Sequence, residues 1–314
     1  MGVTGTLVVA VLAAAAAAAQ STATDVAIAR GVKYLSVEVP KWKAEHPCYS
    51  CHNNGDAARA LMVASARGYD IGTSLDDTIG FLKQPAGWNQ SKAAAGFDDK
   101  QLARVQFASA LAVAHEHGRA PRGDLEGAAK LLVADQQPDG SWTLDQSQSI
   151  ASPATYGTII ATWSARRTLL QSGLPASHAA ITNANQWIRG LKPQNVIDCA
   201  AVILALDRAN DSAAEELRRI CLTILKNGQS RDGGWGPYVT SAPQVFDTAM
   251  AVQALALLDG SEFREAIATG KAFLVSQQRP DGSWPETTRP ADQESYAQRI
   301  STTGWAILAL LSGR

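Results

Sequence analysis

A seven-residue pattern recurs along this chain and constrains its fold more than any other feature. The pattern is Gln-x-x-Asp-Gly-x-Trp, in residues 136–142 (QQPDGSW), 229–235 (QSRDGGW) and 278–284 (QRPDGSW), and residues 84–88 (QPAGW) look like a worn copy. An Asp-Gly pair favours a tight turn, since glycine tolerates positive φ, and Trp is a large apolar body that can hold the turn against neighbouring helices. The repeat therefore predicts structural staples between helices, and by itself it indicates no chemistry. We assign the staples to Gln137, Gly140, Trp142, Gln229, Gly233, Trp235, Gln278, Gly282 and Trp284.

Helical patterns of two kinds alternate between these copies. Residues 262–277 are amphipathic, with charged residues on one side only, whereas residues 245–258 are apolar nearly all round. A helix without a polar face must be enclosed on both sides, so we expect it to lie inside a ring of amphipathic helices. The expected outer helices are 26–36, 75–83, 125–135, 178–189, 213–225 and 262–276, and the expected inner helices are 56–66, 102–116, 155–170, 196–206, 247–258 and 302–311.

Six such pairs predict an all-α fold. Pairs that cannot bury their own apolar faces stack side by side, and an array that curves back on itself closes into an α/α toroid of six inner and six outer helices. With 314 residues and 46% hydrophobic residues, the chain can form one such domain over residues 21–314. The net charge is −1 and no Lys/Arg run is present, which excludes the electrostatic footprint of a nucleic-acid-binding protein.

Residues 1–20 form an uncharged apolar run that ends in small residues. This composition predicts a secretory signal peptide with cleavage near Ala19 or Gln20, and hence an exported protein of bacterial type in the periplasm or outside the cell. A signal peptide usually has a Lys or Arg before its apolar run, and none precedes the run here. The alternative is a retained membrane anchor, in which case the protein would contact a membrane.

The repeat resembles the motif of squalene and oxidosqualene cyclases and of the related protein prenyltransferase subunits. The resemblance covers most of the chain after residue 20, and it implies an α/α toroid whose cavity, lined by aromatic residues at the ends of the inner helices, holds an isoprenoid. The chain is about half the size of a cyclase, so it provides one toroid where those enzymes use two. The resemblance is specific for the fold and much less specific for a reaction.

The acid motif of the triterpene cyclases is altered in this chain. Those enzymes carry Asp-x-Asp-Asp-Thr-Ala, whose middle Asp protonates an alkene, and the matching residues 244–249 read QVFDTA. Phe246 stands where that acid should be, and phenylalanine cannot donate a proton. Asp247 is the remaining catalytic candidate, but a carboxylate in the first turn of a helix is stabilised by the helix dipole, and Asp247 is equally well explained as a first-turn residue.

Cys48, Cys51 and His52 form the pattern Cys-x-x-Cys-His, which is typical of c-type haem attachment. Two thiols add to the haem vinyl groups and the adjacent His ligates the iron, so haem c is the preferred cofactor. The alternatives are zinc held by His52 with both thiolates, a small disulfide, or a loop with no cofactor. Met62, His115 and His117 are candidates for the second iron ligand.

A second zinc site is suggested by the protein prenyltransferases, which hold zinc with Asp, Cys and His at inner-helix ends. Asp198, Cys199 and His52 provide these residue types, although the spacing departs from that family's pattern. A closed toroid would also gather, around one mouth, the polar residues that open its inner helices, and their convergence would indicate a ligand site. These residues are Asp56, Asp99, Tyr156, Asp198, Asp247 and Thr302, beside His52.

Three functions are consistent with these observations. The leading hypothesis is a non-cyclising ligand-binding or redox protein, with haem c, a redox partner and an apolar small molecule in the central cavity. The second is an enzyme acting on an apolar isoprenoid, either a divergent terpene cyclase or a transferase related to the prenyltransferases. The third is a scaffold for interactions without catalysis.

We expect a covalent haem band in the visible spectrum of the denatured, reduced protein after expression with the haem-maturation apparatus. The expectation follows from Cys48 and Cys51, whose thioether bonds to haem would survive denaturation. A spectrum without that band would exclude haem c.

Overall fold

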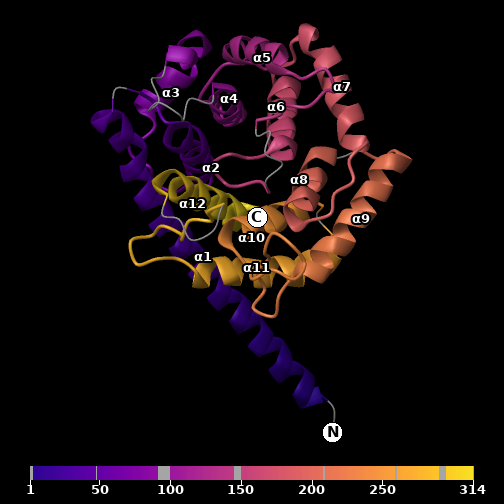
Figure 1. Cartoon of the computed structure of the whole chain (residues 1–314). Coiled ribbons are helices and arrows are strands. Elements are labelled where there is room, and N and C mark those ends of the chain that lie inside the picture. Colours follow the sequence, from indigo (N-terminus) through magenta and orange to yellow (C-terminus); the bar gives the residue numbers. More distant parts are fainter. Residues whose placement is uncertain are drawn as a thin grey trace.

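The computed structural model describes residues 3–46, 48–90, 100–144, 150–207, 209–258, 260–289 and 295–313. Over these residues the chain is helical and forms two concentric rings of helices (Figure 1). No named strand occurs in the described part; Gln229 and Trp235 form an isolated antiparallel bridge. The all-α toroid expected from the sequence is confirmed.

The helices alternate between the two rings in chain order. The outer ring consists of α1 (Val3–Glu45), α3 (Asp76–Leu82), α5 (Asp124–Asp135), α7 (His178–Arg189), α9 (Ser212–Gly228) and α11 (Arg264–Ser276). The inner ring consists of α2 (Ala58–Ala66), which continues the π-helix η1 (Cys51–Ala57), and of α4 (Lys100–Glu116), α6 (Thr158–Ser172), α8 (Val196–Leu206), α10 (Val245–Leu257) and α12 (Tyr296–Leu311). Three short 3₁₀ helices complete the connections: η2 (Pro85–Gln90), η3 (Pro175–Ser177) and η4 (Ser261–Phe263).

The inner ring is closed. Each inner helix contacts the next one along the chain, and α12 contacts both α2 and η1, while α1 lies against α11 and α12. Figure 1 shows the resulting circle, with the N-terminal part of α1 projecting from it. Closure places the start of every inner helix at one end of the ring and its finish at the other.

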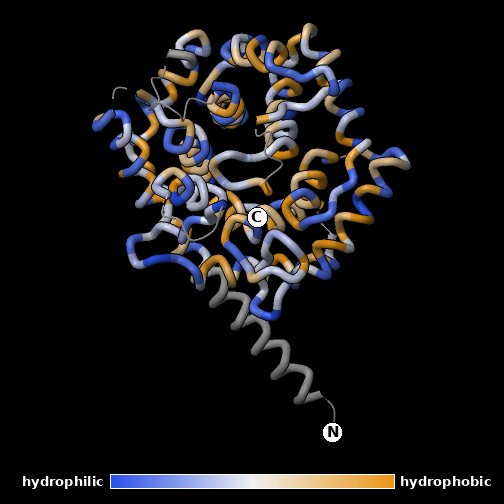
Figure 2. Tube along the Cα trace, in the orientation of Figure 1, coloured by the Kyte–Doolittle hydropathy of each residue, from blue (hydrophilic) through white to orange (hydrophobic). Residues whose placement is uncertain are grey.

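Burial separates the two kinds of helix as their sequences predict. Every residue of α8 except Asp198 is buried, whereas in α9 only Ala214, Leu217, Cys221, Leu225 and Gly228 are buried, which form one helical face. Figure 2 shows the same contrast, because α8 is largely orange and α9 alternates between orange and blue. Burial of an all-round apolar helix removes its whole side-chain surface from water, worth about 25 cal/mol per Å².

The three staples make the same hydrogen bonds in each copy. The indole N–H donates to a carbonyl at the end of the preceding outer helix, from Trp142 to Leu132 at 2.9 Å, from Trp235 to Leu225 at 2.7 Å and from Trp284 to Leu274 at 2.6 Å. The Trp backbone N–H donates to a Thr hydroxyl on the following inner helix, at Thr162, Thr248 and Thr303. Each Trp therefore joins an outer helix to the inner helix that follows it.

The glutamine amide adds a link to the next outer helix. Gln136 donates to Ala180 O at 2.8 Å, Gln229 to Ala266 O at 3.0 Å and Gln278 to Ala27 O at 2.8 Å. In the first copy the bonding residue is Gln136, so the assignment of Gln137 is wrong by one position. Gln136 precedes its Asp by three residues, as Gln229 and Gln278 do, and this shared spacing identifies it. In the worn copy, Trp88 donates to Phe81 O at a longer 3.4 Å.

The third staple joins the two ends of the ring. Gln278, from the end of the chain, bonds to Ala27 of α1, and Arg30 of α1 donates in return to Arg279 O at 2.7 Å. Gly282 has a φ of 93°, and a Cβ built on it would lie 2.5 Å from Arg30 O. Only glycine combines this backbone conformation with so close an approach.

The part of α1 that follows residue 21 belongs to the toroid, since Ile28, Val32, Leu35 and Val39 are buried. Among the helices whose residues are described, none is both long and apolar enough to serve as a membrane span. The signal peptide and export remain predictions, and cleavage near Ala19 or Gln20 would leave these contacts intact.

We expect Gly282→Ala to lower the free energy of unfolding by about 2–4 kcal/mol, because the new Cβ meets Arg30 O and the backbone is strained at positive φ. Denaturant unfolding measures this. The matched control is Gly80→Ala in α3, where no atom lies within 4 Å of the new Cβ; better helix propensity should stabilise that variant by roughly 0.5–1 kcal/mol. Equal effects of the two substitutions would contradict the staple.

Candidate functional site

Asp56 lies at the centre of a buried polar cluster inside the ring. Its carboxyl accepts hydrogen bonds from the Tyr156 hydroxyl, from Ser301 Oγ at 2.8 Å and from Gln106 Nε2 at 3.0 Å, and it is 1% exposed. The donors come from the segment before α6, from α12 and from α4, so four parts of the inner ring meet at one carboxyl. Tyr156 adopts a φ of 65°, an uncommon conformation for a non-glycine residue. Such strain is found where the surroundings require one side-chain position.

The π-helix η1 presents Asp56 and His52 to the interior. Ser50 caps it, and its hydroxyl accepts from the backbone N–H groups of His52 and Asn53 at 3.2 and 3.3 Å. π-helical turns are rare and are frequent at functional sites, because the wider turn changes where side chains point. The sequence gives no sign of this turn.

Arg59, one turn after Asp56, is the cation nearest to it. Its Nη2 lies 3.7 Å from Asp56 Oδ1, beyond hydrogen-bond distance, while Nη1 donates to Ser109 Oγ at 3.2 Å. The guanidinium lies over the ring of Trp305, 4.2 Å from its centroid. The cation is therefore positioned by a π face and a hydroxyl, and it acts on the carboxyl through space.

Burial raises the pKa of Asp56 to about 6, and Arg59 together with the hydrogen bonds from Tyr156 and Ser301 opposes that rise. Desolvation disfavours the charged carboxylate, whereas donors and a cation favour it. Since the effect of burial is the larger, the carboxyl keeps its proton to a higher pH than an exposed Asp does. The same donors stabilise the carboxylate once the proton has left.

His52 is connected to this carboxyl through Ser301. His52 Nδ1 lies 3.3 Å from Ser301 Oγ, and Ser301 donates its one hydroxyl hydrogen to Asp56. While Asp56 is ionised and accepts from Ser301, Nδ1 donates to Ser301 and Nε2 is left as an acceptor. Burial lowers the pKa of His52 to about 4, so the imidazole is neutral at neutral pH. The contacts thus run from the neutral imidazole of His52 through the hydroxyl of Ser301 to the carboxyl of Asp56, whose pKa is raised.

Aromatic rings pack beside this cluster. Trp305 is fully buried, with the rings of Tyr156 and Phe246 edge-on to it at 5.8 and 5.7 Å and that of Trp163 tilted at 6.2 Å. Their π faces carry negative potential, which favours a nearby cation. Phe246, which stands at the position of the cyclase acid, is thus part of the aromatic wall.

Asp247 lies on the other side of this wall. Its carboxylate is fully buried and forms an ion pair with Arg289, while Oδ2 has no hydrogen-bond partner. Burial raises the pKa of Asp247 to about 6, and Arg289 opposes the rise. The direct contact with a guanidinium makes Asp247 a buried ion pair, a role that the sequence did not indicate.

The structure brings together only part of the expected mouth. Asp56, Tyr156 and His52 converge, and Ser301 joins them. The expected residue Thr302 does not, because its hydroxyl accepts from Thr287 N at 3.2 Å. Asp198 bonds to the side chain of Asn195, the cap residue of α8, at 2.7 Å. Asp99 lies outside the described residues. Arg59, Gln106 and Ser301 were missed, although an arginine inside an otherwise apolar helix is a signal that could have found Arg59.

The Cys-x-x-Cys-His motif places its histidine against Cys51 and Ser301. In the described structure the thiols of Cys48 and Cys51 form no disulfide, His52 Nε2 lies 3.8 Å from Cys51 Sγ, and Nδ1 faces Ser301. Both ring nitrogens thus contact protein, and a haem iron would need one of them. Met62 is fully buried, His115 bonds to Ala120 O, and His117 lines a cavity at the far end of the ring.

The described residues include no group of three or more His, Cys, Asp or Glu side chains that could hold a metal ion. Cys199, proposed with Asp198 as a zinc ligand, lies against Cys221, and that contact together with burial raises the pKa of its thiol. Haem c and zinc both remain untested predictions.

Comparison with known proteins places the chain near the terpene cyclases. Residues 191–314 match the squalene-hopene cyclase C-terminal domain family. Drimenyl diphosphate synthase from Streptantibioticus cattleyicolor is 28% identical over 177 residues, which cover 52% of this chain and 32% of that protein. Lanosterol synthase ERG7 from Saccharomyces cerevisiae is 32% identical over 113 residues, which cover 32% of this chain and 15% of that protein. The matched part is thus a third or less of these curated relatives.

Solved structures extend the likeness to the whole toroid. The type II terpene cyclase MstE from Scytonema, in complex with geranylgeranyl dihydroxybenzoate, has a TM-score of 0.60 at 13% identity, covering 93% of this chain and 97% of that chain. ent-Copalyl diphosphate synthase from Streptomyces platensis has a TM-score of 0.54 at 20% identity, covering 81% and 50%. The fold is therefore that of the type II terpene cyclases, and the C-terminal part of the chain is squalene-cyclase-like.

We expect Asp56→Asn to change how stability depends on pH. A raised carboxyl pKa stabilises the fold while the group is protonated, and that stabilisation is lost as pH rises from about 4 through 6. The Asn side chain does not ionise, so the variant does not lose this stabilisation. The difference in the free energy of unfolding, variant minus wild type, should therefore be roughly 2–3 kcal/mol larger at pH 7.5 than at pH 4. Urea unfolding at the two pH values measures it, with the exposed Asp76→Asn as the charge control. No difference between the two variants would contradict the assignment.

Proposed function

We propose that the protein is a divergent terpene-cyclase-like enzyme that encloses an apolar isoprenoid in the toroid and protonates one of its alkenes with Asp56. The observation that carries this proposal is a fully buried carboxyl whose pKa burial raises to about 6, so that it holds a proton up to mildly acidic pH, and which lies beside a wall of aromatic rings.

Alkene protonation needs an acid that holds a proton when the substrate arrives and is kept from water. Burial supplies both conditions for Asp56, and the three donors that point at its oxygens stabilise the carboxylate that remains. The alkene π electrons take the proton to form a C–H bond, and the positive charge appears on the neighbouring carbon.

The aromatic wall supports the charge that this step creates. The rings of Tyr156, Phe246 and Trp305 offer π faces, and the one hydroxyl among them, that of Tyr156, is engaged in its hydrogen bond to Asp56. Loss of a proton from the final cation to a neutral base gives a neutral product. His52, which is neutral because burial lowers its pKa, is such a base beside the acid.

Asp56 fits this role better than Asp247. Burial raises the pKa of both carboxyls to about 6, so the difference between them is geometric. The guanidinium of Arg289 contacts Asp247 directly, whereas the nearest cation to Asp56 lies 3.7 Å away and hydroxyl and amide donors meet its oxygens beside the aromatic rings. The proposed acid therefore lies in η1, and not at the start of α10, where Phe246 stands at the position of the middle Asp of the cyclase motif.

The substrate class follows from the comparisons. The named relatives are a drimenyl diphosphate synthase and a lanosterol synthase, and the similar MstE structure contains a geranylgeranyl dihydroxybenzoate. A linear isoprenoid is therefore the substrate that we propose. Export and a haem c at Cys48, Cys51 and His52 are separate proposals, which the sequence motifs alone support.

We expect conversion of at least one of squalene, farnesyl diphosphate and geranylgeranyl diphosphate to a cyclic product, detected by mass spectrometry. Asp56→Asn should lower turnover by about 10²–10⁴-fold, because an amide cannot donate the proton. Asp247→Asn should retain far more activity if its role is the ion pair.

If Asp247→Asn lowers turnover far more than Asp56→Asn does, then Asp247 and not Asp56 is the acid. Binding of the isoprenoids without turnover would replace the enzyme by a binding protein. If the protein neither binds nor converts these isoprenoids, the result would favour the scaffold without catalysis.

A further inference from the structure

A cavity of about 400 Å³ opens at the opposite end of the ring from Asp56. All six inner helices contribute to it near their C-terminal ends, so it lies on the axis of the toroid. Arg59 belongs to its lining and also faces Asp56, which places the guanidinium between the cavity and the acid.

The cavity is lined by more positive than negative charge. Arg59, Arg67, Arg166 and Arg167 line it, against the two carboxylates of Glu116 and Asp207. Within the cavity, Arg167 and Glu116 form a close pair at 2.5 Å, and the arginines still outnumber the carboxylates by four to two. An excess of guanidinium groups in a partly enclosed space favours an anion there.

Arg59 has donor atoms that the protein does not satisfy. The residue is 3% exposed, and its Nε and Nη2 atoms are buried without a hydrogen-bond partner. Leaving buried guanidinium donors unpaired is costly, and Nη2 faces Asp56 at 3.7 Å, so the contribution of Arg59 to the cavity is its positive charge in the lining.

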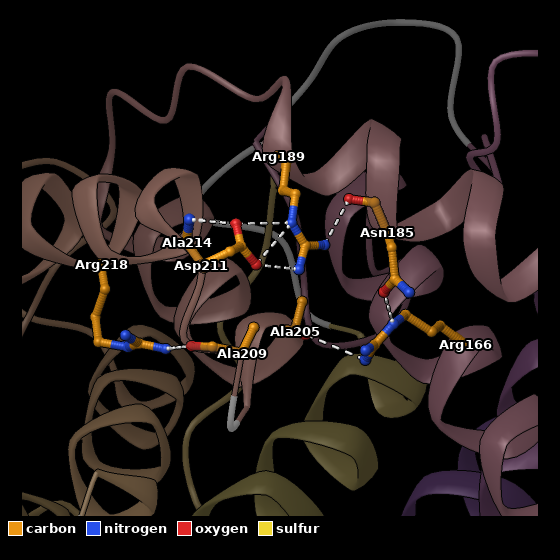
Figure 3. A network of polar contacts seen from close by, with 8 residues as sticks. All are labelled: Arg166, Asn185, Arg189, Ala205, Ala209, Asp211, Ala214 and Arg218. Atoms are coloured by element: carbon orange, nitrogen blue, oxygen red, sulfur yellow. Dashed lines mark hydrogen bonds and ion pairs between the residues drawn. The ribbon is translucent and has the colours of Figure 1, made fainter.

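Arg166 is held in a fixed orientation by residues behind it. Its Nε donates to Asn185 Oδ1 at 2.6 Å and its Nη1 to Ala205 O at 3.1 Å. The backbone carbonyl of Asn185 in turn accepts from Arg189, which forms an ion pair with Asp211 at the cap of α9 (Figure 3). Burial lowers the pKa of both Arg166 and Arg167, as expected for cations that lack full solvation. The arginines are therefore pre-oriented at modest entropic cost to a ligand.

The rim of the cavity is apolar. Leu170 and Leu257 are 47% and 43% exposed, which is unusual for large hydrophobic residues of this chain, and both line the cavity together with Val63, Leu308 and the ring of Trp163. Polar donors at the floor and leucines at the rim match a molecule that is charged at one end and apolar along its body.

We propose that this cavity binds an amphipathic organic oxyanion, a carboxylate or phosphate monoester with a hydrocarbon body, at a site separate from the proposed acid. The oxyanion head lies toward Arg59, Arg166 and Arg167, and the hydrocarbon body lies along Leu170 and Leu257. The observations that carry this site are the charge of its lining and its exposed leucines, and neither depends on the protonation of Asp56, so the site stands whether or not the proposed enzyme activity does.

The test uses dodecyl phosphate below its micelle concentration, with dodecanoate to compare the two head groups and dodecanol as the neutral analogue. Titration calorimetry on the full chain measures affinity, and quenching of Trp163 fluorescence reports on the cavity. We expect the anions to bind with one-to-one stoichiometry and at least tenfold more tightly than dodecanol, with affinity that falls as salt increases. Equal binding of dodecanol would overturn the proposal.

Two sets of variants locate the site. Arg67→Gln combined with Arg167→Gln should weaken dodecyl phosphate at least tenfold, because Glu116 loses its partner and repels the head group, whereas the exposed Arg264→Gln should leave affinity unchanged. Leu170→Ser combined with Leu257→Ser should weaken dodecyl phosphate several-fold and leave inorganic phosphate unaffected. Circular dichroism confirms folding of each variant. Binding that none of the cavity variants changes would contradict the assignment.

Discussion

The enclosure of the inner helices, of which α8 and α10 are apolar nearly all round, is the constraint on which this structure depends. Helices such as α8 cannot face water, and a closed ring is the arrangement that surrounds each one on all sides. The Trp turns make that ring possible, because each joins two outer helices and one inner helix through the same three hydrogen bonds. The third turn, at Trp284, ties the end of the chain to α1, so closure depends on a contact between residues about 250 positions apart.

A closed ring of apolar helices creates an interior in which any polar group has unusual properties. Asp56 and Arg59 are one helical turn apart in that interior, yet they face different regions. The carboxyl meets hydroxyl and amide donors beside aromatic rings, and the guanidinium forms the floor of a cavity at the other end. Low dielectric strengthens both effects, raising the pKa of the acid and increasing the cost of unpaired donors. One turn of helix thus separates a region suited to positive charge from one suited to negative charge.

The sequence predicted the architecture closely because its signals are local. The periods of the twelve helices and the Asp-Gly turns need no knowledge of distant contacts, and α7 and α8 begin and end where their patterns do. The site was predicted only in part. Asp56, Tyr156 and His52 were placed at one mouth, but Ser301 and Gln106 join them through contacts of 245 and 50 residues in separation. The Cys-x-x-Cys-His pattern was given most weight, although η1 turns His52 toward Ser301, which no local pattern reveals.

The central claim is that the buried carboxyl of Asp56 keeps its proton up to about pH 6 inside the toroid, well above the range of an exposed Asp. Infrared difference spectra between the wild type and Asp56→Asn, recorded from pH 4 to pH 8, measure this proton directly through the C=O stretch of the protonated carboxyl. The account predicts a carboxyl band that is absent from the variant and disappears with a midpoint near pH 6. A carboxyl that is already ionised at pH 5 would contradict it.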